Sequence, residues 1–509
     1  YDLKLIYRGK RLINWDPKLE TTVSDDEIEW VEEKTSLYYL KYGPFIIATS
    51  RPETKFGDKY IVMHPNDDRY KNYSNGQKIE LDWIDGKITA TIIKDEIIDK
   101  DFGSGVMTIT PSHDKTDFEI ALRHNLSHAP IIDFKGKLLP IAGEFNGQYI
   151  KKARALIVER LKEKNLNEEY LHRIAKNSRG GGIIEPQIKE QWFINVSKKF
   201  RLEKSNFKTI ESGSDLTIKE LLEKTITNNE INIIPEHFKK TYFHWINNLH
   251  DWCISRQLWF GHEIPIAYCA NCNQEKFIDK DIKDLICKNC NHKIFNKDPD
   301  TLDTWFSSGL WTFSALGWPN KIEDLKIYHP TSILVTGYDI LFFWVARMIL
   351  MTSVILNEVP FKIAYLHGLV RDERKQKMSK SKGNIIDPLS ITDVYGTDAL
   401  RMALIFNTAS GNDMALSEEK IKGMKHFANK FWNIARYIFQ NTEKSNFKNN
   451  ESISPITDED KEILNQLENA KKKLYEELNN YNFHEAAQTI YQFIWYHLAD
   501  TYLEASKAQ

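Results

Sequence analysis

Short apolar runs fill the stretch from about Leu37 to Lys176. They are rich in β-branched and aromatic residues, and Gly and Asp turns separate them, which is typical of short strands. We therefore predict a compact β-rich insert that forms a domain of its own. The clearest predicted strands are residues 45–48, 88–93 and 106–110.

A different pattern begins after the insert. From about Ile184 to Gly411 strand-like and helix-like segments alternate, as they do in α/β domains. From Glu418 onward apolar residues recur at helical spacing, and a polar linker from about Glu443 to Ser454 separates the first predicted helix from a later helix pair. The residues that mark these helices are Met424, Phe427, Phe431, Ile434, Ile438, Leu464, Leu467, Ala486, Ile490, Phe493 and Leu498.

Length and composition fit a multidomain globular protein. The 509 residues are too many for one core, while 41% apolar and 28% charged residues are ordinary values. We expect no apolar run able to cross a bilayer and see no signal peptide, so we predict a cytoplasmic location. The formal net charge of −2 lacks the basic excess of a nonspecific nucleic-acid binder, so RNA contacts would come from local patches.

Four of the five cysteines form two Cys-x-x-Cys pairs, Cys269 with Cys272 and Cys287 with Cys290. Without an export signal, this pattern favours a metal over disulfides. Two turns can present four thiolates to one tetrahedral Zn²⁺ and leave no position for a catalytic water, so we predict a structural zinc ribbon. We interpret His292 as a bystander. A zinc ribbon alone would also fit a nucleic-acid-binding module.

A small, strongly cationic loop follows a strand-like stretch that ends in Leu369 and Val370. Its lysines can move onto the phosphates of a nucleotide and stabilise charge at the α-phosphate, while its glycine and serines allow movement. A lysine-rich loop is more often only a solvated surface loop. The loop reads Lys377, Met378, Ser379, Lys380, Ser381, Lys382, Gly383, Asn384.

This order resembles the second signature motif of the class I aminoacyl-tRNA synthetases, without a mismatch over its five core positions. The resemblance implies that Lys377 and Lys380 face the phosphates as the catalytic pair. Mg²⁺ would accompany the nucleotide. The implied ATP-binding residues are Lys377, Met378, Ser379, Lys380 and Ser381.

Further segments narrow the resemblance to the valyl, isoleucyl and leucyl group. Residues 252–262 and 302–311 are similar to catalytic-domain segments of that group, and the similarity continues through 368–372 and 395–401. Residues 337–348 resemble the helix of the valyl enzymes more than its isoleucyl or leucyl counterparts. The resemblance therefore implies ATP-dependent joining of valine to tRNA(Val), with isoleucyl specificity as the runner-up.

The same helix supplies a predicted amino-acid pocket. Ile340 and Trp344 lie four residues apart on one helix face and could wall a pocket of branched-aliphatic size, with Asp339 available for an ammonium group. The resemblance adds Trp305 to this wall. From the pattern alone, such a stripe is more often core packing.

A pocket for valine cannot strongly reject threonine, and the discrimination of threonine by valyl enzymes, about 10²-fold, is the standard example of this limit. A second, hydrolytic site is therefore expected. Residues 49–54 and 103–117 resemble the paired motifs of the editing domain in this synthetase group. The β-rich insert is thus the predicted editing domain.

Asp114 and Asp117 lie three residues apart at a predicted helix start, so both carboxylates can face one site. We assign Asp117 to the α-ammonium of mischarged threonine, and Asp114 or Thr110 to its hydroxyl. In the alternative reading Asp114 only caps the helix. No Ser-His-Asp triad is visible, and His113 is weak evidence for one, so hydrolysis is expected to use a positioned water and the hydroxyls of the substrate.

Three further residues are assigned to the predicted editing site. Arg51 is suited to the terminal adenosine or its phosphate. Thr49 and Thr54 are suited to orienting the ester and a water.

The first signature motif of the family, a His-x-Gly-His tetrad, occurs nowhere in the chain, and residues 14–17 resemble the entry into the insert. We therefore expect a fragment that makes little or no valyl-adenylate alone. A free-standing tRNA-editing or tRNA-binding module stays an alternative. The expected partners are tRNA(Val), valine and ATP, with the protein a monomer.

The resemblance implies a multidomain α/β architecture. It combines the C-terminal half of a class I Rossmann-type catalytic domain with a β-rich editing insert, a zinc ribbon and an α-helical anticodon-binding bundle. The expected limits are 1–36 for the entry from the catalytic domain, 37–180 for the editing domain, 181–415 for the catalytic domain with its ribbon at 265–295, and 416–509 for a truncated anticodon-binding domain.

Overall fold

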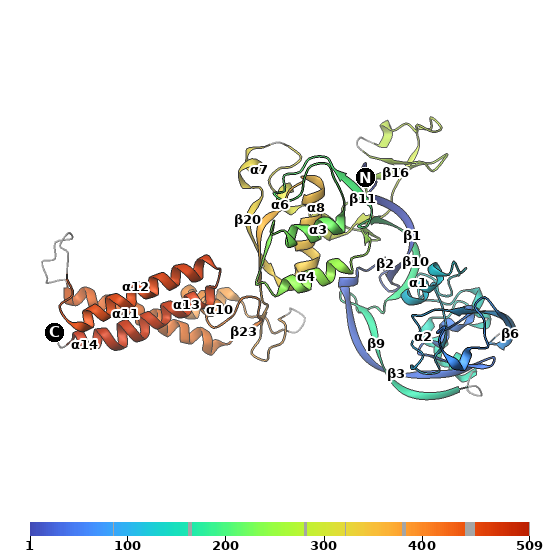
Figure 1. Ribbon diagram of the computed structural model, residues 1–509, viewed down its shortest axis with the longest axis horizontal. Helices are drawn as coiled ribbons and strands as arrows, with labels where there is room; N and C mark the ends of the chain where they lie inside the picture. Colours follow the sequence, from blue (N-terminus) through green and yellow to red (C-terminus); the bar gives the residue numbers. More distant parts are fainter. Residues whose placement is uncertain are drawn as a thin grey trace. The chain divides into compact units, whose positions relative to one another are not determined.

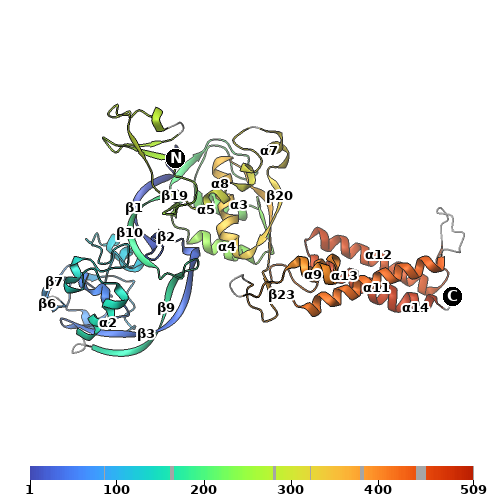
Figure 2. The same cartoon turned by 180° about the vertical axis from the view of Figure 1, so that it is seen from behind.

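The computed structural model describes residues 1–84, 86–160, 165–278, 282–320, 322–378, 383–442 and 454–507 (Figures 1 and 2). The chain divides into two compact units. The first unit comprises Tyr1–Phe200 and His250–Ser307, and the second comprises Arg201–Leu249 and Ser308–Gln509.

A long antiparallel ribbon, β3 (Ile28–Tyr42) with β9 (Asn165–Asn177), leads into the β-rich part of the first unit (Figure 1). The beginning of β3 is open to solvent, and Trp30 is 61% exposed there, whereas Leu40 and Tyr42 near its end are buried. Strand β4 (Phe45–Thr49) pairs with that buried end. The apolar side chains of β3 are therefore concentrated where the ribbon reaches the core.

A mixed sheet of order β6-β7-β5-β8 forms the centre of this β-rich module. All four residues of β5 (Tyr60–Met63) are buried, because alternate side chains enter different clusters: Ile61 and Met63 one, Tyr60 and Val62 the other. Helix α2 (Ile150–Arg160) packs into the first cluster and α1 (Lys115–Arg123) into the second. The two helices thus cover opposite faces of β5.

The strands predicted at 45–48, 88–93 and 106–110 are confirmed as β4, β7 and β8, although β8 ends two residues early. The remaining elements of the module are short. They are η1 (Asp25–Glu27), η2 (Pro52–Gly57), η3 (Asp68–Tyr70), β6 (Lys78–Trp83), β7 (Gly86–Lys94), β8 (Val106–Thr108) and η4 (Pro140–Phe145).

An antiparallel sheet of order β14-β10-β1-β2 lies beside the ribbon. Strand β1 pairs with β10 from Ile6 opposite Ile194 to Trp15 opposite Glu185, which brings Glu185 to the base of the ribbon. Two smaller sheets follow, β15-β19 and the three-stranded β17-β16-β18 that carries the cysteines. The elements are β1 (Ile6–Asp16), β2 (Thr21–Thr22), β10 (Glu185–Ile194), β14 (Trp252–Cys253), β15 (Ser255–Arg256), β16 (Ile266–Cys269), β17 (Glu275–Phe277), η6 (Ile282–Asp284), β18 (Phe295–Lys297), β19 (Thr301–Leu302) and α5 (Thr304–Ser308).

The second unit contains a parallel sheet of order β13-β21-β20. Parallel neighbours need a crossover, and α8 (Arg347–Ile355) connects β20 to β21, as the predicted α/β pattern requires. The other elements here are β11 (Lys199–Leu202), β12 (Ser214–Thr217), α3 (Ile218–Thr227), β13 (Asn232–Ile234), α4 (Phe238–Asn247), α6 (Trp311–Ser314), α7 (Glu323–Tyr328), β20 (Thr331–Gly337), β21 (Phe361–His367), β22 (Val370–Arg371) and β23 (Met414–Ala415).

The helix predicted over 337–348 is not a regular α-helix. A 3₁₀ turn, η7 (Tyr338–Ile340), is followed by a π-helical turn, η8 (Leu341–Ala346), before α8 begins. The prediction that Ile340 and Trp344 share one face of a regular α-helix is therefore wrong, because one lies in a 3₁₀ turn and the other in a π-helical turn. π-Helical turns inside helices are frequent at functional sites.

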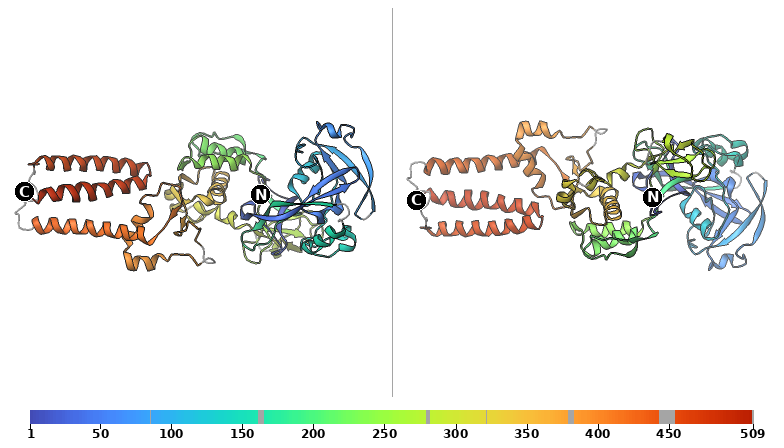
Figure 3. Two further views of the ribbon diagram at one scale, coloured as in Figure 1. Left: turned by 90° about the horizontal axis from the view of Figure 1, so that it is seen from below. Right: turned by 90° about the horizontal axis from the view of Figure 1, so that it is seen from above.

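Long helices follow β23, as predicted from Glu418 onward, and α11, α12 and α13 run side by side in Figure 3. Met424, Phe427 and Ile434 are buried on α11, whereas Phe431 and Ile438 are 53% and 37% exposed. Two shorter helices precede β23, α9 (Pro388–Tyr395) and α10 (Thr397–Ile405). The elements after it are α11 (Glu418–Thr442), α12 (Asp458–Asn479), α13 (Phe483–Gln492), η10 (Phe493–Leu503) and α14 (Glu504–Ser506).

One helical stretch, Tyr338–Ile355, is long and apolar enough to cross a membrane by length and composition alone, which the sequence analysis did not anticipate. Its mean hydropathy is 1.6, and 56% of it is buried inside the protein. A buried core helix passes the same test, so this stretch is weak evidence for a membrane span.

We predict that Ile61→Ala destabilises the β-rich module by about 2–5 kcal/mol, because it leaves a cavity beneath a fully buried strand. Hydrogen exchange of the β5 amides measures this locally. The control is Ile46→Ala on β4, whose side chain is 52% exposed and which should change stability by less than about 0.5 kcal/mol. Equal effects of the two variants would contradict the core assignment.

Candidate functional site

The two predicted editing segments meet in the β-rich module. Thr49 ends β4, Thr54 lies in η2, Thr110 follows β8, and Asp114 and Asp117 stand at the start of α1. Strand β8 pairs antiparallel with β5, and β5 follows η2 closely in the chain. The fold therefore brings residues about sixty positions apart into one neighbourhood.

Asp117 is a buried carboxylate in the first turn of α1, only 6% exposed. Its Oδ2 accepts a 2.6 Å hydrogen bond from the backbone N of Thr110. Burial raises the pKa of Asp117 to about 7, and the nearby carboxylate of Asp114 adds to the rise. Near neutral pH this group is thus divided between its charged and neutral forms.

Asp114 is exposed and serves as the N-cap of α1. Its Oδ1 accepts a 3.0 Å hydrogen bond from the backbone N of Asp117. The capping alternative is confirmed. A role of Asp114 in reading the hydroxyl of a substrate stays a prediction.

Thr110 belongs to a buried polar cluster that the sequence analysis did not identify. Its Oγ1 donates a 3.1 Å hydrogen bond to Asp58 Oδ1, and Asp58 Oδ2 lies 3.1 Å from Lys55 Nζ. The Lys55 ammonium also donates to Thr108 Oγ1 at 3.2 Å. Burial raises the pKa of Asp58, although Lys55 acts against that rise.

The guanidinium of Arg51 is engaged by acidic partners. Its Nη2 donates to both carboxylate oxygens of Glu185 at 2.8 and 2.6 Å, and its Nε to Glu53 at 3.4 Å. Glu53 is fully buried and also accepts two hydrogen bonds from Arg154. The predicted contact of Arg51 with an adenosine or phosphate would need the Glu185 pair to open, and it stays a prediction.

The two threonines assigned to the ester hold the bend around Arg51. Thr49 Oγ1 accepts a 3.0 Å hydrogen bond from Arg51 N, and Thr54 Oγ1 donates a 2.9 Å bond to Arg51 O. Thr54 is buried and Thr49 half-buried. Their predicted catalytic roles are untested.

His113 is a structural residue in this geometry. Its Nε2 accepts hydrogen bonds from the backbone N of Ile131 and of Ile132, at 2.8 and 3.2 Å, so the proton of the neutral ring lies on Nδ1. Nδ1 is 3.1 Å from Pro186 O and 3.4 Å from Glu185. With both nitrogens committed to the fold, His113 is not oriented as a catalytic base.

The four cysteines predicted as metal ligands form one cluster. Their Sγ atoms all lie within 4.8 Å of one another, and three Sγ pairs are 3.5 Å apart. Tetrahedral Zn–S bonds of about 2.3 Å would place the sulfurs about 3.8 Å apart, so the donor set fits zinc. Among the described residues, His292 is not part of the cluster.

A local repeat shapes the two turns of the cluster. In each, the backbone N of an asparagine donates to the carbonyl of the first cysteine, Asn273 to Cys269 at 2.8 Å and Asn291 to Cys287 at 2.9 Å. Both asparagines have positive φ, 56° and 57°. The sequence signal is an asparagine directly after each second cysteine, which the sequence analysis overlooked.

The cationic loop is described only in part, since Ser379, Lys380, Ser381 and Lys382 lie outside the described residues. Lys377 Nζ is 3.9 Å from Asp339 Oδ2, and both side chains are well exposed. Predicted phosphate-binding and ammonium-binding groups therefore lie in one neighbourhood of the second unit. Met378 is half-buried beside Lys377.

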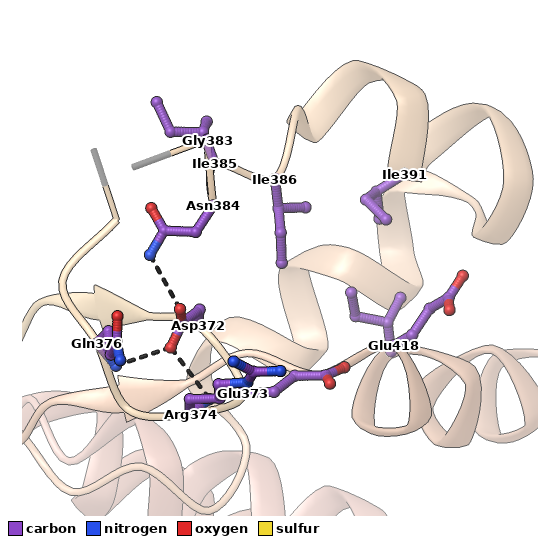
Figure 4. A pocket seen from close by; sticks show the side chains of 11 residues that line it. Asp372, Glu373, Arg374, Gln376, Gly383, Asn384, Ile385, Ile386, Ile391 and Glu418 are labelled. Carbon is purple, nitrogen blue, oxygen red and sulfur yellow. Dashed lines mark hydrogen bonds between the residues drawn. The ribbon is translucent and has the colours of Figure 1, made fainter. Parts of the chain in front are cut away.

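A cavity of about 820 Å³ opens beside this loop and is not where a polyphosphate is expected (Figure 4). Asp372 faces it, accepting hydrogen bonds from the backbone N of Arg374 and Gln376 and from Asn384 Nδ2 at 2.9 Å. Glu373 and Glu418 add acidic groups, with Arg374 as a cation. Among the described residues that line this cavity, acidic groups outnumber cations, which disfavours an anion there, so we do not assign the cavity to ATP.

The predicted amino-acid pocket is partly assembled. Asp339 and Ile340 lie in η7 and Trp344 in η8 of the same unit, and Trp344 Nε1 donates a 3.0 Å hydrogen bond to Ser308 O. Trp305 belongs to the first unit, where Asp303 Oδ1 accepts a hydrogen bond from its backbone N. The assignment of Trp305 to the amino-acid pocket stays a prediction.

The sequence matches two families of known proteins. The family model "tRNA synthetases class I (I, L, M and V)" matches residues 1–417, and the model "Anticodon-binding domain of tRNA ligase" matches residues 460–509. The chain belongs to the class I tRNA synthetases. It combines a catalytic region of this family, mixed α/β with a four-cysteine cluster, with an anticodon-binding domain.

Curated relatives are valine–tRNA ligases. The chain is 41% identical to that of Pseudothermotoga lettingae over 100% of its own length and 57% of the relative, and 40% identical to those of Clostridium tetani and Thermotoga maritima, over 100% of its length and 56% of each relative. The chain thus spans little more than half the length of these relatives.

Among solved structures, the LeuRS of Agrobacterium radiobacter K84, in a ternary complex with tRNA and LeuAMS, matches with a TM-score of 0.50. The match covers 100% of this chain and 67% of that one at 16% identity. Such a likeness shows the shared synthetase fold and nothing finer.

Sequence reasoning on this synthetase chain missed Lys55, Asp58 and Glu185. Lys55 and Asp58 carry a weak signal, a lysine and an aspartate three residues apart in a turn flanked by apolar strands. Glu185 carries none, because its partner Arg51 is 134 residues away in the chain.

We predict that the purified chain binds one zinc ion and that Cys272→Ser loses it, because three thiolates hold the metal much less tightly than four. Elemental analysis of zinc per chain measures this. Cys253→Ser is the matched control, since Cys253 lies outside the cluster, and it should keep its zinc. Full zinc content in Cys272→Ser would contradict the assignment.

Proposed function

We propose that this chain is part of a valine–tRNA ligase, an enzyme that joins valine to tRNA(Val) with ATP and hydrolyses mischarged threonyl-tRNA(Val). The observation that carries the proposal is the 41% identity to valine–tRNA ligases along the whole chain. The chain's share of those relatives is 57%, so the complete reaction belongs to the longer protein.

The second unit would supply the activation step. Lys377, with Lys380, would neutralise the charge that develops on the α-phosphate of Mg²⁺-bound ATP, and Met378, Ser379 and Ser381 would line the nucleotide. The 3.9 Å separation of Lys377 Nζ from Asp339 Oδ2 supports this, because an amino-acid ammonium at Asp339 would lie close to the phosphates. Ile340 and Trp344 would wall the branched side chain, and the role of Trp305 rests on the family resemblance alone.

The β-rich module would perform the editing. Asp117 would hold the α-ammonium of the threonyl ester, Thr110 or Asp114 would read its hydroxyl, and the bend at Arg51 would orient the ester through Thr49 and Thr54. What supports this is a buried carboxylate that Thr110 orients from its backbone. A positioned water would be the nucleophile, since both ring nitrogens of His113 already have backbone partners.

A bound zinc would stabilise the cysteine module and take no part in either reaction, because four protein ligands complete its tetrahedron. The helices from α11 onward would contact tRNA as an anticodon-binding bundle. We also propose that the protein is a cytoplasmic monomer.

Hydrolysis of threonyl-tRNA(Val) by this chain tests the proposal. We expect selective hydrolysis, with valyl-tRNA(Val) left intact. An isoleucyl enzyme would instead hydrolyse valyl-tRNA(Ile), because its editing site must remove valine. A stand-alone editing module would also hydrolyse threonyl-tRNA(Val), but the full protein encoded by its gene would not activate valine.

We predict that Asp117→Asn lowers this hydrolysis by about 10- to 100-fold, the loss expected when a charge-assisted hydrogen bond to an ammonium is replaced by a neutral one. The steady-state rate on threonyl-tRNA(Val) is the readout. Asp82→Asn, an exposed position on β6, is the control and should leave the rate unchanged. A fully active Asp117→Asn would remove Asp117 from the site.

The hydrolysis should also rise with pH across neutrality. Because the pKa of Asp117 is raised to about 7, the carboxylate is mostly neutral below that pH and mostly ionised above it. Only the ionised form attracts the ammonium, so the rate at low substrate should fall as pH drops from 8 to 6. A flat profile over this range would contradict the assigned role.

A further inference from the structure

Lys55 carries a buried ammonium directly beneath the candidate editing site. Its side chain is 7% exposed, and it lies in η2, whose residues Pro52, Glu53 and Thr54 are also buried. Removing an ammonium from water costs several kcal/mol per ion even in real proteins, so a buried lysine without partners is rare. The proposed editing reaction as described above makes no use of it.

A continuous set of contacts joins Lys55 to Asp117. Lys55 Nζ is 3.1 Å from Asp58 Oδ2, Thr110 Oγ1 donates to Asp58 Oδ1 at 3.1 Å, and Thr110 N donates to Asp117 Oδ2 at 2.6 Å. Thr108 Oγ1 holds the ammonium from the other side at 3.2 Å. One lysine therefore lies behind the threonine that orients the editing carboxylate.

The charges around Asp117 explain why a cation is needed there. Asp114, on the same helix, and Asp58, from the segment after η2, both oppose its ionisation. Lys55 is the cation that favours it, and His113 on the neighbouring loop is turned toward Glu185. Without Lys55, three carboxylates would share this region, and like charges so close cannot all ionise near neutral pH.

We propose that Lys55 is a positioning residue for editing: by pairing with Asp58 behind Thr110, its ammonium keeps Asp117 ionised so that the carboxylate can hold the α-ammonium of the mischarged amino acid. The inference rests on the proposed editing function. Lys55 contacts no reacting atom, and it acts by offsetting the negative charge of Asp58 close to Asp117.

The test compares the pH profile of threonyl-tRNA(Val) hydrolysis in the whole chain and its variants. Lys55→Met keeps the length of the side chain and removes the charge, and it should move the acidic limb upward by about one pH unit, the effect of losing a nearby opposite charge. Lys59→Met removes the same charge from an exposed position four residues away and should leave the limb in place. A uniform loss of rate without a shift would overturn the proposal.

Lys55→Met leaves the Asp58 carboxylate buried without its cation, and this variant could fail to fold. A second variant therefore tests the proposal independently. Asp58→Asn removes a like charge and keeps Lys55, so it should move the acidic limb to lower pH. A limb that stays in place, or moves upward, would overturn the proposal even if Lys55→Met does not fold.

Carbon-13 NMR of aspartate-labelled chain, with Asp117→Asn to assign the signal, separates this inference from the editing proposal. The midpoint of the Asp117 titration should rise by about one unit in Lys55→Met or fall in Asp58→Asn. If the midpoints move but the unmodified chain hydrolyses no threonyl-tRNA(Val), the editing proposal fails and Lys55 loses its role with it. If hydrolysis is present and the midpoints do not move, only the Lys55 proposal fails.

Discussion

The antiparallel pairing of β5 with β8 is the constraint on which the β-rich module depends. The register places Ile61 opposite Thr108 and Met63 opposite Val106. Because side chains alternate along a strand, a slip of one residue would turn Thr108 away from Lys55 and carry the residues after β8 out of place. Two apolar clusters, one on each face of β5, resist such a slip, since it would exchange every buried residue for its neighbour.

Around that strand pair the protein tolerates several buried charges, and the geometry of each is different. Both carboxylate oxygens of Glu185 accept from Arg51 Nη2, and Glu53 accepts two parallel hydrogen bonds from Nε and Nη2 of Arg154, so these pairs recover much of their desolvation cost. The Lys55–Asp58 contact is a single approach between a point charge and one oxygen. Apolar residues of similar volume would stabilise that position as well or better, so a charged pair there fits a functional demand more readily than a structural one.

The sequence carried the features that depend on local pattern. Residues 45–48 and 88–93 form strands because β-branched and aromatic side chains are concentrated there between turns, and the cysteine spacing suffices to place four thiolates in one cluster. The role of Asp114 as a helix cap could likewise be predicted from its position before a helix. Each of these follows from residues within one turn or strand.

What the sequence could not provide depends on distant pairing or on departures from regular geometry. Glu185 stands at the start of β10, opposite Trp15 of β1, and it meets Arg51 across 134 residues of chain, a contact that no local pattern encodes. The irregular turns η7 and η8 replace a helix that propensity alone favours, because an apolar run fits an α-helix and a π-turn equally well by composition. Fine placement of Asp339 and Trp344 therefore came only from the fold.

The cysteine module has too small an apolar core to be stable by itself. Its buried cluster consists of only Ala267, Cys269, Leu285, Cys287 and Phe295, with the other two cysteines packed against it. So small a core buries too little apolar area to offset the entropy of ordering its loops. Metal binding can supply that missing stability, because the binding free energy of a four-thiolate site becomes folding free energy for the segment that holds it. The thiolates are therefore as much a part of the core of this module as its apolar side chains, and a metal that fits them would decide whether the strands β16, β17 and β18 persist as a sheet.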